Sequence, residues 1–341
     1  MQVSEHNDME ESGQIRLNKA TREWVIYAPS RRKRPQDFQQ RSQEKPTLVN
    51  RVASCPFCED GQHQSELILL ELLDPDGKGW QTRTIVNKFP ALTPDNSTQR
   101  SEAGIYMAMA SYGQHEVVIE SPDHHQTIAT MPLAQVEILI ETYHQRYMTL
   151  MEDPNNMMAI IFRNHGRGGG ASLRHPHSQI IATGFVPRNR RIQEEEAQRY
   201  FDQWGRCVYC DILEFERHER KRAIEENDSF FAFVPFAAEV PFEIWILPKQ
   251  HKADFGCISP REKSDFASIL KNMLLKLYEK LNDPDYNWAI YTAARYKAEE
   301  PQVHWFCQIR PRLTTPAGFE MGSGISINPS LPEIDADFLK R

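Results

Sequence analysis

The stretch from Gly168 to Phe185 reads GGGASLRHPHSQIIATGF and places His175 and His177 one residue apart. Alternate side chains of an extended strand face the same side, so both imidazoles would share one face. Such a pair can bind one metal ion, contact one substrate, or divide the two tasks. The rest of the sequence decides among these three uses.

Four of the six cysteines form two C-x-x-C pairs, CPFC at Cys55 and Cys58 and CVYC at Cys207 and Cys210. In a large intracellular chain such pairs are typical of metal sites or redox motifs. A thioredoxin-like motif needs a strand before the pair and a helix after it. The segment EDGQHQSELILLELL after Cys58 does not clearly supply that helix, so zinc is favoured over redox chemistry.

The chain contains an internal repeat. EVVIESPDHH begins at Glu116 and EIWILPKQH at Glu243, and each has a histidine eight residues later, His124 and His251. An amphipathic helix is expected after each, over 132–151 and 260–281, and then a strand, over 157–162 and 287–292. Each half then carries the pattern H-x-x-x-Q-I. Four motifs in the same order indicate a duplication, against the alternative of chance similarity.

The repeat supplies four candidate ligands in each half, and Cys₂His₂ is a standard closed tetrahedral zinc set. The two predicted sets are Cys55, Cys58, His124 and His175 in the first half and Cys207, Cys210, His251 and His304 in the second. Because each set is already four-coordinate, we expect two structural zinc ions per chain.

His177 is then not needed for the metal, and the second half has Phe306 in its place. A neutral imidazole can attack phosphorus and carry a phosphoryl or nucleotidyl group covalently. The preceding glycine run, Gly170 included, could bring backbone N–H groups to anionic oxygens, and Ser172 and Gln179 could add side-chain donors. The alternatives are a packing histidine and a flexible glycine loop.

Near the start, Arg31, Arg32, Lys33 and Arg34 form a basic run after the strand-like WVIYA. Arginine forks suit nucleotide phosphates, whereas basic runs are more often solvated surface. The chain as a whole is acidic, with a net charge of −7 and a pI of about 6.0. This argues against a general nucleic-acid binder.

With 341 residues the chain suggests roughly two domains. No apolar run approaches the ~20 residues of a membrane span, and the N-terminus lacks a signal-peptide core, so we expect a cytoplasmic protein.

The motifs CPFC, SPDHH and NHGRGGGASLRHPHSQ, together with SRRKRP, VNKFPAL and GFEMGSG, resemble the galactose-1-phosphate uridylyltransferase family, a branch of the histidine-triad superfamily. The resemblance runs over nearly the whole chain. It implies tandem histidine-triad-like halves, a homodimer, and transfer of a nucleoside monophosphate through a nucleotidyl-histidine intermediate with ping-pong kinetics. It implies that His177 is the nucleophile, that Gln179 and Ser172 contact the phosphate, and that the first Cys₂His₂ set binds zinc. The other implied contacts are Asn164 with the sugar phosphate, Arg31 and Arg34 with the nucleotide phosphates, Asn87 with the base and ribose, and Phe319 and Glu320 with the hexose across the dimer interface.

Gln179 stands where a histidine-triad hydrolase would carry a third histidine, which resembles the transferase branch. Three features resemble ADP-glucose phosphorylases instead: the order H-P-H-S-Q, the second C-x-x-C pair, and the tail GFEMGSGISINPSLPE. That branch passes AMP to phosphate or sulfate. We expect transfer of the UDP-glucose and galactose-1-phosphate type, with the adenylyl reaction as one alternative and a non-catalytic nucleotide-sensing module as another. Asn87 and Phe57 are the candidates for a base pocket.

The expected fold class is α+β, with two histidine-triad-like halves, each an antiparallel sheet with packed helices and one zinc site. We expect residues 1–195 to carry the nucleophile and the first zinc, and residues 196–341 to carry the second zinc and the hexose and dimer contacts. The expected partners are a nucleotide sugar and a sugar-1-phosphate or phosphate, with no nucleic acid and no membrane.

Overall fold

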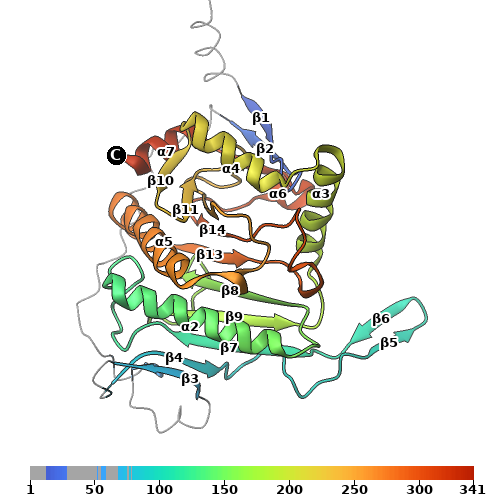
Figure 1. The fold of residues 1–341 in the computed structure, drawn as a ribbon, viewed down its shortest axis with the longest axis vertical. Coiled ribbons are helices and arrows are strands. Elements are labelled where there is room, and N and C mark those ends of the chain that lie inside the picture. The colour runs from blue at the N-terminus through green and yellow to red at the C-terminus, as the bar shows by residue number, and fades with distance from the viewer. Residues whose placement is uncertain (1–12, 29–51, 53–54, 59–67, 75–76, 78) are drawn as a thin grey trace, which may run out of the picture.

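The computed structural model describes residues 13–28, 52, 55–58, 68–74, 77 and 79–341. Within them, a ten-stranded sheet forms the centre of the molecule, and every neighbouring pair of its strands is antiparallel (Figure 1). In spatial order the strands are β10 (Ala223–Glu226), β11 (Phe230–Phe233), β12 (Ile244–Pro248), β14 (Phe306–Pro311), β13 (Tyr286–Tyr291), β8 (Met158–His165), β9 (His177–Thr183), β7 (Gly113–Ile119), β4 (Trp80–Val86) and β3 (Ile68–Leu73).

Each half of the chain contributes five strands to this sheet, in mirrored order. The two sets meet where β8 pairs with β13, with Asn164 opposite Asn287. We expected a separate sheet in each half, but the halves share one. The reason is that β8 and β13 would each be an edge strand in a separate sheet, and their pairing satisfies the backbone groups that such an edge leaves open.

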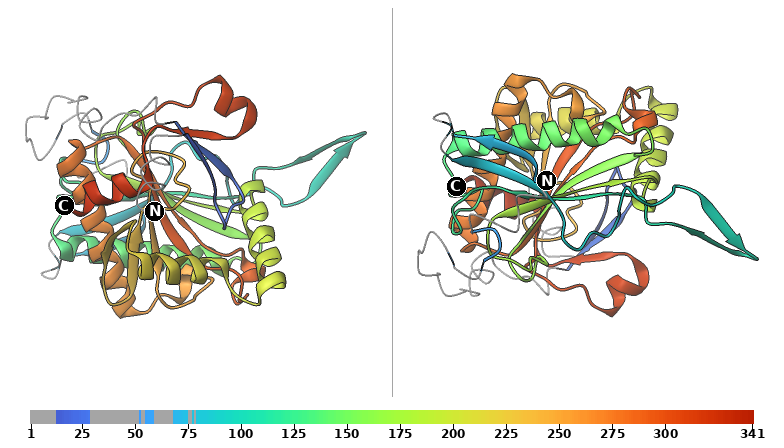
Figure 2. Two further views of the ribbon diagram at one scale, coloured as in Figure 1. Left: turned by 90° about the horizontal axis from the view of Figure 1, so that it is seen from above. Right: turned by 90° about the horizontal axis from the view of Figure 1, so that it is seen from below.

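Helices α2 (Leu133–Glu152) and α5 (Pro260–Leu281) lie side by side on one face of the sheet (Figures 1 and 2). Both match the helices expected from the apolar periodicity. Their inward positions recur every three or four residues. The buried apolar and aromatic side chains of α2 are Val136, Leu139, Ile140, Tyr143, Tyr147 and Leu150. Side chains from both halves pack into a single hydrophobic core between these helices and the sheet.

Capping residues define the ends of α5. The Ser259 hydroxyl accepts a hydrogen bond from the backbone N–H of Glu262, and the Glu262 carboxylate accepts one from the N–H of Ser259. This capping box satisfies two N–H groups that the first turn would leave open. At the other end, Asn282 adopts a left-handed conformation with φ of 60°.

The remaining described elements surround this core. They are α3 (Arg188–Trp204), α4 (Val208–Glu219), α6 (Gly318–Ser323), α7 (Pro332–Lys340), the 3₁₀ helices η4 (Phe255–Cys257) and η5 (Arg295–Lys297), the sheet of β1 (Gln14–Leu17), β2 (Trp24–Tyr27) and β15 (Ser326–Asn328), and the hairpin of β5 (Arg100–Ala103) and β6 (Tyr106–Met109). The β5–β6 hairpin extends away from the body as an arm, and α6 lies in a projecting loop (Figure 2).

The domain boundary predicted between 195 and 196 falls inside α3, and the division into domains stays a prediction. In the described part of the chain, no helix has both the length and the apolar character to cross a membrane.

Candidate active site and Cys/His clusters

Strand β9 presents the two candidate catalytic side chains to the sheet face opposite α2 and α5. Ser178 and Ile180 face the helices, since Ser178 Oγ lies 2.7 Å from the Tyr143 hydroxyl of α2 and Ile180 belongs to the central core. The side chains of a strand alternate. His177 and Gln179 therefore face the other side of the sheet.

The backbone fixes the tautomer of His177. Its Nδ1 lies 2.8 Å from the carbonyl oxygen of His175, which can only accept, so Nδ1 carries the proton and Nε2 carries the lone pair. Burial lowers the pKa of His177, the His175 carbonyl raises it, and the positive charge of Arg163 lowers it further. The net lowering favours the neutral imidazole, which is the nucleophilic form.

Phe57 of the CPFC motif forms one wall beside His177. Its ring meets His177 edge-on, with 5.6 Å between ring centroids, and His175 at 5.8 Å. It packs with Val117 and Ile119 of β7 in a small apolar cluster. The C-x-x-C loop therefore contributes both metal-ligand candidates and an apolar surface next to the nucleophile candidate.

Gln179, His115 and Asn87 form a polar group on the same face. Nε2 of His115 lies 2.7 Å from Oε1 of Gln179 and 3.1 Å from Nδ2 of Asn87. Asn87 follows β4, and its backbone N–H donates to the carbonyl of His115. The structure therefore places Asn87 and Gln179 on either side of His115, and their contacts with a nucleotide stay a prediction.

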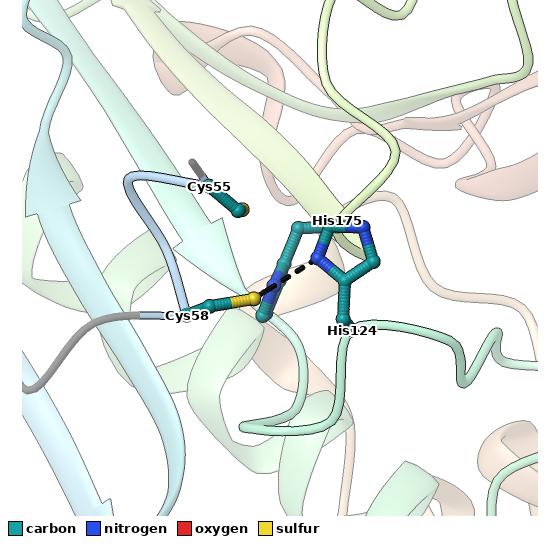
Figure 3. Close-up of side chains that lie close together, drawn as sticks. All are labelled: Cys55, Cys58, His124 and His175. Atoms are coloured by element: carbon teal, nitrogen blue, oxygen red, sulfur yellow. Dashed lines mark hydrogen bonds between the residues drawn. The ribbon is translucent and has the colours of Figure 1, made fainter. Parts of the chain in front are cut away.

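The first Cys/His cluster assembles from three separate segments (Figure 3). One ligand atom from each of Cys55, Cys58, His124 and His175 lies within 4.8 Å of the others. Sγ of Cys58 is 3.0 Å from Nδ1 of His124 and 3.3 Å from Nδ1 of His175. Two thiolates and two imidazole nitrogens converging in this way fit a tetrahedral zinc ion.

His175 is oriented for metal binding by its second ring nitrogen. Nε2 lies 2.8 Å from the carbonyl oxygen of Ser121 and donates to it, which leaves the Nδ1 lone pair toward Cys58. An N–H to carbonyl contact of this kind is the usual support of a metal-bound histidine. Burial lowers the pKa of His175 to about 4, so the ring is neutral and able to coordinate.

The second cluster repeats this arrangement with Cys207, Cys210, His251 and His304, again within 4.8 Å of one another. Nε2 of His304 lies 3.1 Å from the carbonyl of Pro248, and Nδ1 faces Cys210 at 3.6 Å. The same histidine tautomer is therefore selected in both halves. The two predicted ligand sets each come together, and both fit a metal ion.

The glycine run is shaped by contacts with the second half of the chain. The Gly168 N–H donates to the Asp285 carboxylate at 2.6 Å, and the N–H groups of Gly170 and Ala171 bond to the carbonyls of Arg167 and Gly166. A Cβ on Gly169 would lie 2.3 Å from the carbonyl oxygen of His165. The hydrogens of these three N–H groups are bonded within the protein in this structure, and a contact of Gly170 with substrate stays a prediction.

The loop is held next to Asn164 by a residue that the sequence analysis missed. Nδ2 of Asn287, on β13, donates to Oδ1 of Asn164 at 2.8 Å and to the Gly169 carbonyl at 2.6 Å. No sequence motif marks Asn287, because its proximity depends on the pairing of β8 with β13. His115 was missed as well. It lies two residues before Val117 on the same strand, so both side chains share one face of the sheet, and Val117 pairs with Gln179.

Among the described residues, no hydrogen bond joins Ser172, Phe319 or Glu320 to this group. Ser172 is exposed on the loop between β8 and β9. Phe319 is 51% exposed on α6, and among the described residues no interaction joins it or Glu320 to His177 or Gln179. Arg31 and Arg34, with the rest of the basic run, lie outside the described residues.

Comparison with known proteins gives a consistent result. The sequence model for the galactose-1-phosphate uridyl transferase family matches this chain in two parts, the N-terminal domain over residues 2–187 and the C-terminal domain over residues 193–315. An ADP-glucose phosphorylase of Arabidopsis thaliana is 35% identical over 327 residues, which cover 95% of this chain and 91% of that protein. A galactose-1-phosphate uridylyltransferase of Thermotoga maritima is 32% identical over 330 residues, covering 94% and 95%.

Solved structures share the fold over nearly the full length. An Arabidopsis thaliana ADP-glucose phosphorylase with bound ADP-glucose has a TM-score of 0.81 at 32% identity, covering 97% of this chain and 98% of that one. A structure described as a uridylyltransferase has a TM-score of 0.74 at 25% identity, covering 96% and 97%.

Proposed function

Because this chain belongs to the galactose-1-phosphate uridyl transferase family, we propose that it moves a nucleoside monophosphate from a nucleotide sugar to a phosphate-bearing acceptor, with His177 as the nucleophile. The observation that carries this proposal is the orientation of His177. Its Nδ1–H is held by the His175 carbonyl at 2.8 Å, so its Nε2 lone pair is available for attack.

In the first step Nε2 attacks the α-phosphorus of the nucleotide sugar. The Nε2–phosphorus bond forms, and the bond from that phosphorus to the bridging oxygen breaks. The sugar-1-phosphate leaves with the electron pair. The ring becomes cationic in the adduct, and its Nδ1–H continues to donate to the His175 carbonyl.

In the second step an oxygen of the acceptor phosphate attacks the same phosphorus, and the Nε2–phosphorus bond breaks. With a sugar-1-phosphate the product is a new nucleotide sugar, and with inorganic phosphate it is a nucleoside diphosphate. Gln179 and Ser172 are proposed donors to the phosphate oxygens. Asn87 is a proposed contact to the nucleoside, and Asn164 to the sugar phosphate.

Each Cys/His cluster is proposed to hold one structural zinc ion. The donor sets and the paired N–H to carbonyl contacts of His175 and His304 support this. A four-ligand set leaves no position for substrate, so the chemistry that zinc supplies here is structural. Holding His175 also holds the carbonyl that orients His177.

Two donors are candidates, UDP-glucose and ADP-glucose. We favour ADP-glucose, with phosphate as acceptor, because an ADP-glucose phosphorylase is a relative at 35% identity and a structure with bound ADP-glucose has a TM-score of 0.81. The second C-x-x-C pair and the H-P-H-S-Q order support the same choice. UDP-glucose with galactose-1-phosphate is the second candidate, supported by the relative at 32% identity.

A homodimer is also proposed. The loop that carries α6 projects from the body, and Phe319 is half exposed on it (Figure 2). In the family that the sequence resembles, the positions of Phe319 and Glu320 contact the hexose across the dimer interface. Among the described residues, no interaction joins either of them to His177 within one protomer, so the hexose contact is assigned to the second protomer of the proposed dimer.

Isotope exchange tests the proposed function. Labelled glucose-1-phosphate is incubated with the protein and either unlabelled ADP-glucose or UDP-glucose, with no other acceptor. Ping-pong transfer requires that label enters the matching nucleotide sugar. We expect exchange with ADP-glucose, and we expect none in His177→Ala.

Each other outcome has a defined meaning. Exchange with UDP-glucose alone would replace the donor and leave the His177 chemistry in place. Exchange that persists in His177→Ala would contradict the proposed nucleophile. Tight nucleotide binding without exchange for either donor would instead support a non-catalytic nucleotide-sensing module.

A further inference from the structure

His115 lies on β7, two residues before Val117, the residue that pairs with Gln179 in the ladder between β7 and β9. Nδ1 of His115 is 3.1 Å from the backbone nitrogen of Ala91, whose N–H donates to it. A backbone N–H can only donate, so Nδ1 bears no hydrogen, and the single proton of the neutral ring is on Nε2. That proton points to Oε1 of Gln179, 2.7 Å away.

This hydrogen bond sets the direction of the Gln179 amide. With Oε1 accepting from His115, the NH₂ group of Gln179 is turned the other way. Nδ2 of Asn87 is also a donor, because Oδ1 of Asn87 accepts from the Phe89 N–H at 2.9 Å. Because both nitrogens are donors, the 3.1 Å contact between Nδ2 of Asn87 and Nε2 of His115 is not a hydrogen bond, and the Nε2 proton is left to the Gln179 oxygen.

The second half of the chain shows the opposite arrangement. Trp245 pairs with Gln308 as Val117 pairs with Gln179, so the residue equivalent to His115 is Glu243. Glu116, which the eight-residue spacing had aligned with Glu243, is therefore one position out of register. Nε2 of Gln308 donates to Oε1 of Glu243 at 2.7 Å.

The side-chain amides of the equivalent residues Gln179 and Gln308 therefore have opposite orientations. In the first half, His115 contacts the amide oxygen of Gln179, and this half carries the candidate nucleophile His177. In the second half, Glu243 accepts from the amide nitrogen of Gln308, and Phe306 occupies the position equivalent to His177, so no nucleophile is present there.

We propose that His115 is a positioning residue for nucleotidyl transfer, which holds the Gln179 amide with its NH₂ directed at the anionic oxygens of the reacting phosphate. This inference rests on the proposed function, in which Gln179 donates to that phosphate. A donor that is already oriented contributes most when charge develops on the phosphate oxygens, because no reorganisation is then needed.

A matched pair of uncharged variants tests it. His115→Gln places an amide N–H at the position of Nε2, whereas His115→Met has a similar length and no donor. The measurement is the single-turnover rate of protein labelling from ADP-glucose or UDP-glucose labelled at the α-phosphate. We expect His115→Gln to stay within about threefold of the unmodified protein and His115→Met to be at least about tenfold slower, as for loss of one hydrogen bond that orients a transition-state donor.

The same pair in a Gln179→Ala background separates positioning from a purely structural effect. If His115 acts through Gln179, the two double variants label within about twofold of each other. If the ratio of the labelling rates of His115→Gln and His115→Met is the same in both backgrounds, the inference is overturned.

If His115→Met does not fold, His115→Glu replaces it, because a glutamate would accept from Gln179 as Glu243 does from Gln308. A His115→Glu rate equal to that of His115→Gln would also overturn the inference. Absence of labelling in the unmodified protein would overturn the proposed function and this inference with it.

Discussion

His175 connects the first Cys/His cluster to the nucleophile candidate. Its Nδ1 faces Cys58 at 3.3 Å, and its backbone carbonyl accepts from Nδ1–H of His177 at 2.8 Å. A metal ion that fixes the position of His175 also fixes the acceptor that selects the tautomer of His177. Under the proposed function, metal binding and nucleotidyl transfer would be coupled through His175. The second cluster has no such link, since Phe306 follows His304 at that spacing.

Removing one thiolate from each cluster tests this coupling. We expect about two zinc ions per chain in the unmodified protein, and about one in Cys58→Ser or Cys210→Ser. The rate of nucleotidyl labelling should fall by about 10-fold or more in Cys58→Ser, the scale seen when the support of a metal-site histidine is lost. Metal analysis and single-turnover labelling measure both quantities.

Cys210→Ser is the control, because it removes a metal without touching His175. Its labelling rate should stay well above that of Cys58→Ser when the two are compared below their melting temperatures. Equal losses of activity in both variants would argue against the link through His175. Less than one zinc per chain in metal-replete protein would contradict the metal assignment itself.

At the scale of elements, the sequence predicts what local periodicity determines. The two helices α2 and α5, the strands β7 and β12, and both Cys/His sets were expected and are found. Apolar spacing marks the helices, and repeated ligand spacing marks the clusters. These signals lie within segments of the chain, and the duplication presents each of them twice.

Contacts between residues far apart in the sequence could not be predicted from these local patterns. The shared sheet depends on the β8–β13 register, which places Asn287 beside Asn164. The glycine loop is shaped by Asp285, more than 100 residues later in the chain. The parallel pairing of β15 with β2 joins the two ends of the described chain in the same way. No spacing within one segment encodes such a partner.

Helix α7 carries a buried carboxyl group whose titration should affect stability. Asp335 is fully buried and accepts hydrogen bonds from the Phe242 N–H at 2.8 Å and from the Ser330 hydroxyl. Burial raises the pKa of Asp335 to about 7, whereas in an unfolded chain the group loses its proton near pH 4. Between these values the folded state binds more protons, so this group makes the free energy of unfolding fall as pH rises.

Asp335→Asn removes that dependence. The difference in unfolding free energy, variant minus unmodified protein, should grow in favour of the variant by up to about 1.4 kcal/mol per pH unit between about pH 4 and pH 7. It should level off above that range. Urea denaturation at several pH values measures it, and a difference that does not change with pH would show that the carboxyl group titrates normally.

At the scale of the whole molecule, the two halves form one structural unit. A single core joins Leu139 and Ile180 of the first half to Leu270 and Trp288 of the second. Trp288 is 1% exposed, and its ring lies 5.7 Å from that of Tyr143 on α2. With a continuous sheet and a shared core, neither half can unfold without exposing apolar surface of the other.

Trp288→Ala tests this unity. Removing a large buried aromatic side chain should lower the free energy of unfolding by about 3–5 kcal/mol. We expect a single transition at lower denaturant, with the far-ultraviolet and near-ultraviolet circular dichroism signals lost together. Two separated transitions, with one half keeping its original midpoint, would contradict a shared core.

Peptide mapping of a trapped adduct shows whether His177 carries the nucleotidyl group during transfer. The protein is incubated with ADP-glucose or UDP-glucose without acceptor, quenched in alkali, digested, and analysed by mass spectrometry. We expect one nucleoside monophosphate on Nε2 of His177, absent in His177→Ala and released when acceptor is added before the quench. A nucleotide on any other residue, or an adduct that persists in His177→Ala, would contradict it.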